Sequence, residues 1–168
     1  MKIPITKPYF DQRERELLVQ PLDTGWVVQG PFVTEFQSRF AAFTGAKRAF
    51  ATSNCTTALH LSLLALDIEE GDKVVVPSFT YVATANSVEA VGATPVICDI
   101  DLRTFCMDAA ELEKILADDE AHEIKAVMPV NQFGLCADLP KIRALADRHG
   151  AKMIEDCACS FGSFIDGR

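Results

Sequence analysis

A short polar turn between two apolar segments is the first stretch of the sequence with the makings of a binding site. Residues 53–57 read Ser-Asn-Cys-Thr-Thr and lead into the apolar run 58–66. The first turn of a helix has backbone N–H groups without intrahelical acceptors and a positive dipole end, so a phosphate fits there. The Thr56 and Thr57 hydroxyls could donate to the same oxygens. The alternative is that a residue of the turn simply caps the helix.

Three other polar or aromatic stretches follow apolar runs rich in β-branched residues. They are Ser78–Tyr81, Asn131–Gly134 and Asp156–Ser160. In a parallel sheet the carboxyl ends of the strands lie at one edge, and ligands bind beyond that edge. We therefore expect these stretches and the turn at 53–57 to form a single site.

Two side chains of these stretches define the chemistry of the expected site. Tyr81 offers a flat aromatic face, and Asp156 places a carboxylate at the end of a buried strand. A planar cationic heteroaromatic ligand with a phosphate would use both, together with the turn. Pyridoxal 5'-phosphate is such a ligand, because a carboxylate facing its ring nitrogen keeps the ring protonated and able to absorb carbanion charge. The alternative for Asp156 is a helix cap or a structural hydrogen bond.

The elements that must position these residues alternate between strand and helix. Most of the expected strands are apolar on both faces, which is typical of a parallel sheet covered on both sides. The sequence therefore predicts an α/β fold of three layers, a mostly parallel sheet with helices on both faces. The expected strands are 48–52, 73–77, 94–100, 125–130 and 152–156.

The N-terminal region is expected to hold a helix and an irregular loop. The sequence predicts a short polar helix over residues 11–20, with Leu17 and Leu18 facing inward. Pro21 should end this helix because proline lacks a backbone N–H. The loop that follows carries the only tryptophan, Trp26, which either lines a site or packs in the core.

Composition and charge exclude several classes of function. The 168 residues carry a net charge of −8 without a basic run, which argues against nucleic acid or an anionic membrane as a partner. The apolar runs are too short and too charged to span a bilayer, and the N-terminus lacks the apolar core of a secretory signal. The six cysteines of this chain favour free thiols in the cytoplasm. A lone Cys157-x-Cys159 pair does not predict zinc.

The order and spacing of several motifs resemble the nucleotide-sugar aminotransferases of the DegT type, which have the fold-type I pyridoxal-phosphate architecture. The resemblance covers nearly the whole chain, and it is the combination of motifs that is specific. The motifs are Gly-Trp-Val-Val-Gln-Gly-Pro-Phe-Val at 25–33 with Phe36, Ser-Asn-Cys-Thr-Thr-Ala-Leu at 53–59, the run from Gly71 to Tyr81, Gly-Ala-Thr-Pro-Val at 92–96, Asp-Ile-Asp at 99–101 and Ile-Glu-Asp at 154–156.

The resemblance implies a role for individual residues. Cys55 and Thr56 would hold the cofactor phosphate, Tyr81 would stack on the ring, and Asp156 would pair with the ring nitrogen. Cys159 stands where the family commonly has Gln or His in contact with the ring hydroxyl. A thiol is a weaker donor than an amide, so Cys159 fits this role poorly or a neighbour replaces it.

Other positions bear on the substrate or depart from the family pattern. Trp26 and Gln29 are the candidate residues of a substrate loop. Cys55 stands where glycine is common, and Asn131 stands where histidine often follows the strand.

The resemblance also implies a whole protein longer than this chain. The Schiff-base lysine of the family lies in a Ser-x-x-x-x-Lys stretch that would follow Arg168. We expect an N-terminal arm and helix at 1–22, an incomplete cofactor-binding large domain at 23–168, and a small C-terminal domain outside this chain. The isolated chain would then be inactive.

The implied reaction converts a nucleotide-linked keto sugar to an amino sugar, with pyridoxal 5'-phosphate as cofactor and L-glutamate as donor. The implied enzyme is a homodimer in polysaccharide or glycoconjugate biosynthesis. One alternative is a sugar dehydratase of the same family that lacks the Schiff-base lysine. Another is a non-catalytic or regulatory relative with a degenerate cofactor site.

Overall fold

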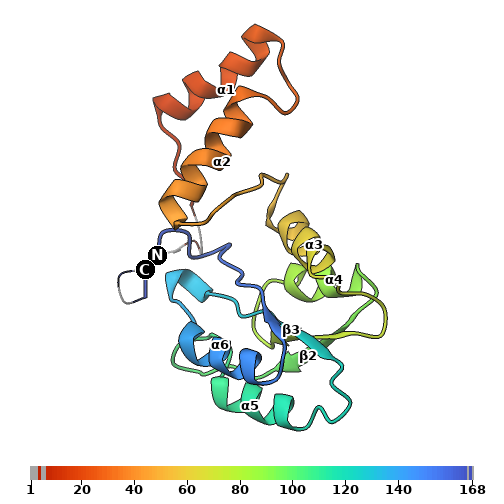
Figure 1. Ribbon diagram of the computed structural model, residues 1–168. Helices are drawn as coiled ribbons and strands as arrows, with labels where there is room; N and C mark the ends of the chain where they lie inside the picture. Colours follow the sequence, from red (N-terminus) through yellow and green to blue (C-terminus); the bar gives the residue numbers. More distant parts are fainter. Residues whose placement is uncertain (1–3, 5–6, 166, 168) are drawn as a thin grey trace. The chain divides into compact units, whose positions relative to one another are not determined.

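The computed structural model describes residues 4, 7–165 and 167 (Figure 1). The chain folds as two compact units, Met1–Ala51 and Thr52–Arg168. Among the described residues no helix is long and apolar enough to cross a membrane.

The first unit begins with helix α1 (Gln12–Thr24). Asp11 caps it, because its Oδ1 accepts from the Arg13 N–H at 2.7 Å. The predicted stop at Pro21 is wrong, since the helix runs on and ends at Gly25 in the left-handed conformation. Pro21 lies in the last turn and removes only one backbone hydrogen bond, which the helix tolerates.

The predicted inward orientation of Leu17 and Leu18 is also wrong. Both side chains are exposed, and α1 buries no residue. The apolar pair is therefore a surface feature of this unit and contributes nothing to a core.

Helix α2 (Pro31–Thr44) follows, with proline in its first turn and Gly45 at φ +71° as its C-cap. The segment after it, 48–52, is not the strand that the sequence predicts. The Ala51 N–H donates instead to Oε1 of Gln37 on α2, at 2.9 Å. A helix side chain thus satisfies a backbone group that a sheet neighbour would otherwise bind.

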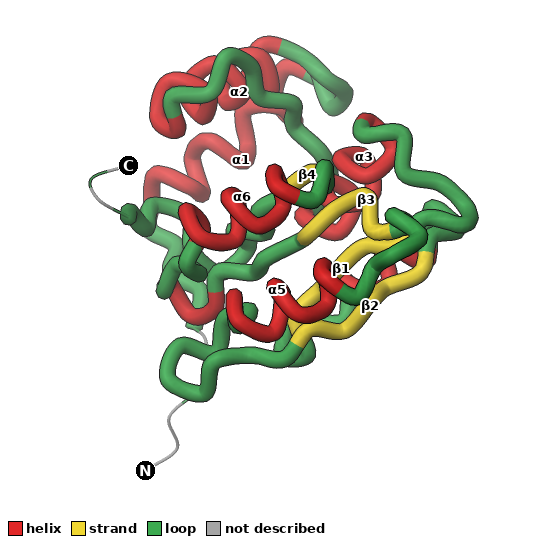
Figure 2. The backbone as a smooth tube through the Cα atoms, turned by 60° about the horizontal axis from the view of Figure 1, so that its bottom comes forward, coloured by secondary structure: helices red, strands yellow, loops and turns green. Residues whose placement is uncertain are grey.

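The second unit is built on a parallel sheet with the strand order β2-β1-β3-β4 (Figure 2). In register, Val75 of β1 lies opposite Val96 of β2 and Val127 of β3. Val127 in turn lies opposite Met153 of β4. The strands are β1 (Lys73–Pro77), β2 (Thr94–Cys98), β3 (Ile124–Val127) and β4 (Lys152–Met153).

Helices cover both faces of this sheet, so the predicted three-layer α/β architecture is confirmed. Val74 and Val76 face one core and Val75 faces the other, as the alternation of a strand requires. The first core lies under α3 and α4, which pack on each other, and the second under α5 and α6 (Figures 1 and 2). The bounds are α3 (Cys55–Ala65), α4 (Ala83–Glu89), α5 (Ala109–Ala117) and α6 (Leu139–Arg148).

Candidate functional site

The centre of the candidate site is Asp156, at the carboxyl edge of the sheet. It pairs with Val130 in an isolated parallel bridge beyond the ends of β3 and β4. Its N–H donates to the Pro129 carbonyl, and its own carbonyl accepts from the Asn131 N–H, both at 3.0 Å. The residue is 5% exposed, so the strand pairing holds a carboxylate almost out of water.

Neutral groups surround the Asp156 carboxylate. Oδ1 accepts from the Ala158 N–H at 3.0 Å and from the Cys55 thiol at 3.7 Å. Oδ2 accepts from the Thr84 hydroxyl at 3.3 Å, and this hydroxyl lies 2.9 Å from that of Thr80. Within the described part of the chain, no Lys, Arg or His forms an ion pair with Asp156.

The turn at 53–57 starts helix α3, as the sequence predicts, and Asn54 caps the helix. The Asn54 Oδ1 accepts from the N–H of Thr57 at 2.9 Å and from its hydroxyl at 3.1 Å. The capping alternative is therefore correct for Asn54. The hydrogen bond to Asn54 Oδ1 also uses the proton of the Thr57 hydroxyl. Among the described residues, the N–H groups of Cys55 and Thr56 have no acceptor, so an anion could still bind at this helix end.

The surroundings of Cys55 keep its thiol protonated. Partial removal of the thiol from water, the charge of Asp156 and the hydrogen bond to that carboxylate raise the pKa of Cys55. The charge of Cys159 raises the same pKa further, which places the exposed Cys159 thiol in the electrostatic neighbourhood of the site. At neutral pH Cys55 is a protonated donor.

Two of the other predicted turns are also tied together. The Gln132 Nε2 donates to the Phe79 carbonyl at 3.0 Å, which links the 3₁₀ turn η1 (Gln132–Gly134) to the turn after β1. Tyr81 ends the latter turn, and its carbonyl accepts from the Thr84 N–H at 3.1 Å. Its side chain is 78% exposed, so its ring is open to a ligand. The structure thus joins all four predicted stretches in one hydrogen-bonded edge.

The side chain of Asn131 binds groups other than the Asp156 carboxylate. Its Nδ2 donates to Glu155 Oε1 at 2.6 Å, and its Oδ1 accepts from the Ala137 N–H at 2.9 Å. Burial and the hydrogen bond to Glu155 raise the pKa of the neighbouring Cys157 thiol to about 12. Asn131, Glu155 and Cys157 therefore form a structural network, with no hydrogen bond to the Asp156 carboxylate.

The loop residues of the first unit form a small structure of their own. The Trp26 Nε1 donates to the Gln29 carbonyl at 2.9 Å, and the indole lies over Gly30. A Cβ at Gly30 would come within 2.2 Å of Nε1. The side chain of Trp26 is exposed, so the alternative of core packing is wrong. The role of Trp26 and Gln29 in a substrate loop stays a prediction.

The sequence reasoning missed Thr84. This residue is 1% exposed and lies in the first turn of α4, four residues after Thr80, which belongs to the turn before the helix. No local pattern in the sequence marks this threonine as part of the site. Its partner Asp156 lies 72 residues away in the sequence, so only the structure reveals this contact.

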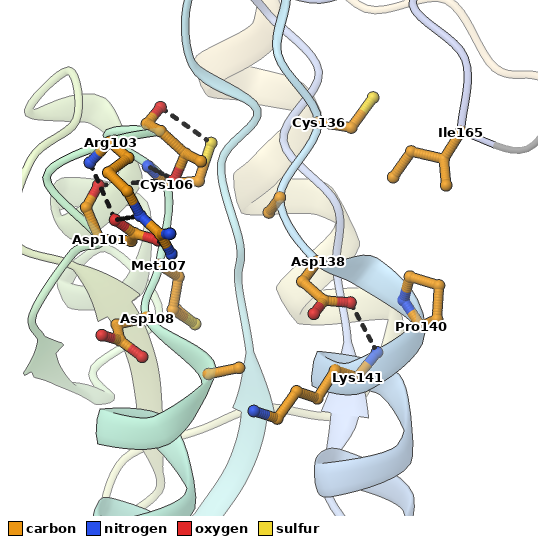
Figure 3. Close-up of a pocket in the computed structure, with 13 residues that line it drawn as sticks. Asp101, Arg103, Cys106, Met107, Asp108, Cys136, Asp138, Pro140, Lys141 and Ile165 are labelled. Carbon is orange, nitrogen blue, oxygen red and sulfur yellow. Dashed lines mark hydrogen bonds and ion pairs between the residues drawn. The ribbon is translucent and has the colours of Figure 1, made fainter.

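A separate cavity of about 550 Å³ lies between the N-terminal ends of α5 and α6 (Figure 3). Its walls carry charges of both signs, including the pair formed by Asp101 and Arg103 at 2.8 Å. This guanidinium lowers the pKa of Asp101 to about 2. Asp108 and Asp138, which line the cavity, already cap the two helices. None of the predicted site residues lines this cavity.

The sequence profile of the DegT/DnrJ/EryC1/StrS aminotransferase family matches residues 8–168. The chain is similar to GDP-perosamine synthase of Caulobacter vibrioides, with 44% identity over 168 residues. It is also similar to GDP-perosamine synthase of Vibrio cholerae, with 38% identity over 167 residues. The match covers 99% of this chain but only 44% of each synthase.

Two solved structures share the fold of this chain. The fold matches 3-amino-5-hydroxybenzoic acid synthase with a TM-score of 0.88 and 31% identity, over 99% of this chain and 43% of that one. It matches NtdA of Bacillus subtilis, solved with bound cofactor PMP, with a TM-score of 0.83 and 33% identity. The latter match covers 90% of this chain and 35% of NtdA.

Proposed function

Because the chain belongs to the DegT/DnrJ/EryC1/StrS aminotransferase family, we propose that the whole protein is a pyridoxal-phosphate-dependent aminotransferase acting on a nucleotide-linked keto-deoxy sugar. L-Glutamate is the amino donor, and the enzyme is a cytoplasmic homodimer in polysaccharide or glycoconjugate biosynthesis. The similarity to two GDP-perosamine synthases makes a GDP-linked sugar the first substrate to test.

The observation that carries this proposal is the buried carboxylate of Asp156. It is held by an amide, a hydroxyl and a thiol, and none of the described residues supplies it with a cation. A charge withdrawn from water is normally paired with an opposite charge. The protonated ring nitrogen of the cofactor would provide that charge.

The rest of the edge fits the same group. The unbonded N–H groups of Cys55 and Thr56 and the Thr56 hydroxyl would hold its phosphate at the positive end of α3. The exposed ring of Tyr81 would cover a face of the pyridine. When bound, pyridoxal phosphate supplies a ring that takes up the electron pair released at the substrate carbon.

Each of three site residues would then have one role toward the bound cofactor. Asp156 keeps the proton on the ring nitrogen, and Tyr81 restricts the plane of the ring and excludes water from one side. The thiol of Cys159 would serve the ring hydroxyl as a weak donor.

A lysine that exchanges the amino group lies outside residues 1–168 in this proposal. The described lysines that make polar contacts bind elsewhere: Lys73 to Glu123, Lys114 to Glu111 and Lys125 to the His122 carbonyl. The residues at 23–168 are then part of the cofactor domain, and a smaller domain completes it.

The test is binding of pyridoxamine 5'-phosphate. This form of the cofactor carries the ring and the phosphate, but it has no aldehyde and so does not need a lysine with which to form a Schiff base. Asp156→Asn should weaken its binding about a hundredfold by calorimetry, because a buried charge loses its partner. The matched control is Glu155→Gln, which changes the adjacent carboxylate on the opposite side of the edge. Equal affinity of Asp156→Asn and the original protein would refute the assignment.

Activity is tested on the whole protein with a GDP-linked 4-keto-6-deoxy sugar and L-glutamate. Formation of the amino sugar and 2-oxoglutarate is the expected result. A protein that binds the cofactor but releases water from the sugar without consuming glutamate would be the dehydratase.

A further inference from the structure

Two threonine hydroxyls and the Asp156 carboxylate form a continuous chain inside the second unit. The Thr80 and Thr84 hydroxyls lie 2.9 Å apart, and the Thr84 hydroxyl lies 3.3 Å from Asp156 Oδ2. Thr84 is 1% exposed and Asp156 is 5% exposed, so water has little access to this chain. The sequence resemblance assigns no role to either threonine.

The direction of the hydrogen bonds follows from the number of protons. A threonine hydroxyl has one hydrogen, and an ionised carboxylate can only accept. Thr84 must therefore donate to Asp156, and Thr80 must donate to Thr84. Each bond polarises the next, so the hydroxyl facing the carboxylate is a better donor than an isolated one.

The carboxylate is held at both of its oxygens. The Ala158 N–H binds Oδ1 and Thr84 binds Oδ2. The terminal torsion of an aspartate is otherwise broad, so a single donor would leave the carboxylate free to rotate. Two donors on different oxygens fix its plane.

Thr84 also contacts the aromatic side of the site through its backbone. Its N–H donates to the Tyr81 carbonyl at 3.1 Å. One residue on α4 thus binds both the carboxylate that would face the ring nitrogen and the turn that carries Tyr81.

We propose that Thr84 is a positioning residue, which with Thr80 behind it fixes the plane of the Asp156 carboxylate toward the N–H of a bound pyridinium ring. This inference rests on the proposed function. The Thr84 hydroxyl acts only through Asp156, so its effect depends on a ligand with a ring nitrogen.

The experiment compares two ligands, each tested on the original chain and on three variants. Pyridoxamine 5'-phosphate has the ring nitrogen, and its 1-deaza analogue has carbon at that position. Thr84→Val removes the hydroxyl at equal shape, and Thr84→Ser keeps it. Ser87→Ala is the matched control, because Ser87 is buried on the same helix but donates to the Thr84 carbonyl, at 2.8 Å.

Thr84→Val should bind pyridoxamine phosphate about tenfold more weakly, as expected for loss of a hydrogen bond to a charged group. Its affinity for the 1-deaza analogue should stay unchanged. Thr84→Ser and Ser87→Ala should both bind as the original chain does.

The outcomes separate this inference from the function beneath it. An original chain that binds both ligands equally would overturn the pairing of Asp156 with the ring, and the proposed function with it. An original chain that prefers pyridoxamine phosphate, beside a Thr84→Val variant with the same preference, would overturn only the positioning role. If circular dichroism shows Thr84→Val unfolded, Thr80→Val decides: a smaller, ring-nitrogen-dependent loss supports the inference, and no loss contradicts it.

Discussion

The Cys55 thiol donates to Oδ1 of Asp156 at 3.7 Å, although 101 residues separate the two in the sequence. The contact joins the first residue of α3 to the carboxyl edge of the sheet. The Cys55 thiol is therefore a hydrogen-bond donor to the same carboxylate that we propose binds the ring nitrogen of the cofactor.

We expect Asp156→Asn to make Cys55 more reactive toward iodoacetamide at neutral pH. Partial withdrawal from water and the Asp156 charge raise the pKa of Cys55, and the substitution removes the second cause. The thiolate population rises about threefold for each half-unit fall in pKa. Peptide mass spectrometry after timed alkylation measures the rate at Cys55, with Glu155→Gln as the control. An unchanged or lower rate would contradict the electrostatic contact.

Alkaline pH should destabilise the second unit through its buried thiols. Burial, followed by the charge of Asp108, raises the pKa of Cys98 to about 12 from an ordinary value of 9.0. The unfolded thiol therefore ionises first, so stability is fully present below pH 9 and falls as the pH rises toward 12. Between pH 8 and pH 10 the free energy of unfolding should drop by about 1.4 kcal/mol for this thiol.

Urea titrations at the two pH values measure this drop. Cys98→Ala should lower the stability at pH 8 but lose less between pH 8 and pH 10 than the original chain. The same pH dependence in Cys98→Ala and the original chain would assign the effect to other groups.

Two substitutions of Asn54, the residue that caps α3, should affect the fold and the anion site separately. Asn54→Ala removes the acceptor of the Thr57 N–H and should cost about 1 kcal/mol of unfolding free energy. Asn54→Asp keeps the acceptor but adds a negative charge beside the proposed phosphate. It should therefore retain stability while binding inorganic phosphate more weakly. Equal phosphate binding by Asn54→Asp and the original chain would argue against a phosphate at this turn.

The chain of residues 1–168 should not acquire a specific lysine adduct with pyridoxal phosphate. A reactive lysine needs burial that lowers its pKa, and the described lysines lie at strand starts, on helix surfaces or in exposed segments. Borohydride reduction followed by peptide mapping should give scattered, substoichiometric modification. A single stoichiometric adduct would show that the exchanging lysine lies within this chain. The described lysines are Lys7, Lys47, Lys73, Lys114, Lys125, Lys141 and Lys152, and Lys2 lies outside the described residues.

The central strand was predictable from local sequence alone. The valine run of β1 lies between a Gly-Asp turn and Pro77, and the observed bounds Lys73–Pro77 agree. Strand β3 ends earlier than predicted, at Val127. Pro129 has no N–H for a ladder, so the pairing resumes only as the bridge between Val130 and Asp156.

The parts of the site that the sequence could not predict depend on pairs far apart in the chain. Asp156 was identifiable from its place after an apolar run, but its donors Cys55 and Thr84 come from two other elements. The opposite orientation of Asn131 follows from its bond to Glu155, which no local pattern reveals. The segment 48–52 has the residue types of a strand but is not one, because β propensity alone does not determine whether another strand lies beside it to pair with.

The alternation of Val74, Val75 and Val76 on β1 makes one strand the common wall of both cores. A slip of this strand by one residue would exchange the faces that Val74, Val75 and Val76 present, so both packing interfaces would change together. The register of β1 therefore couples the two helical layers, because any shift that alters one core alters the other as well.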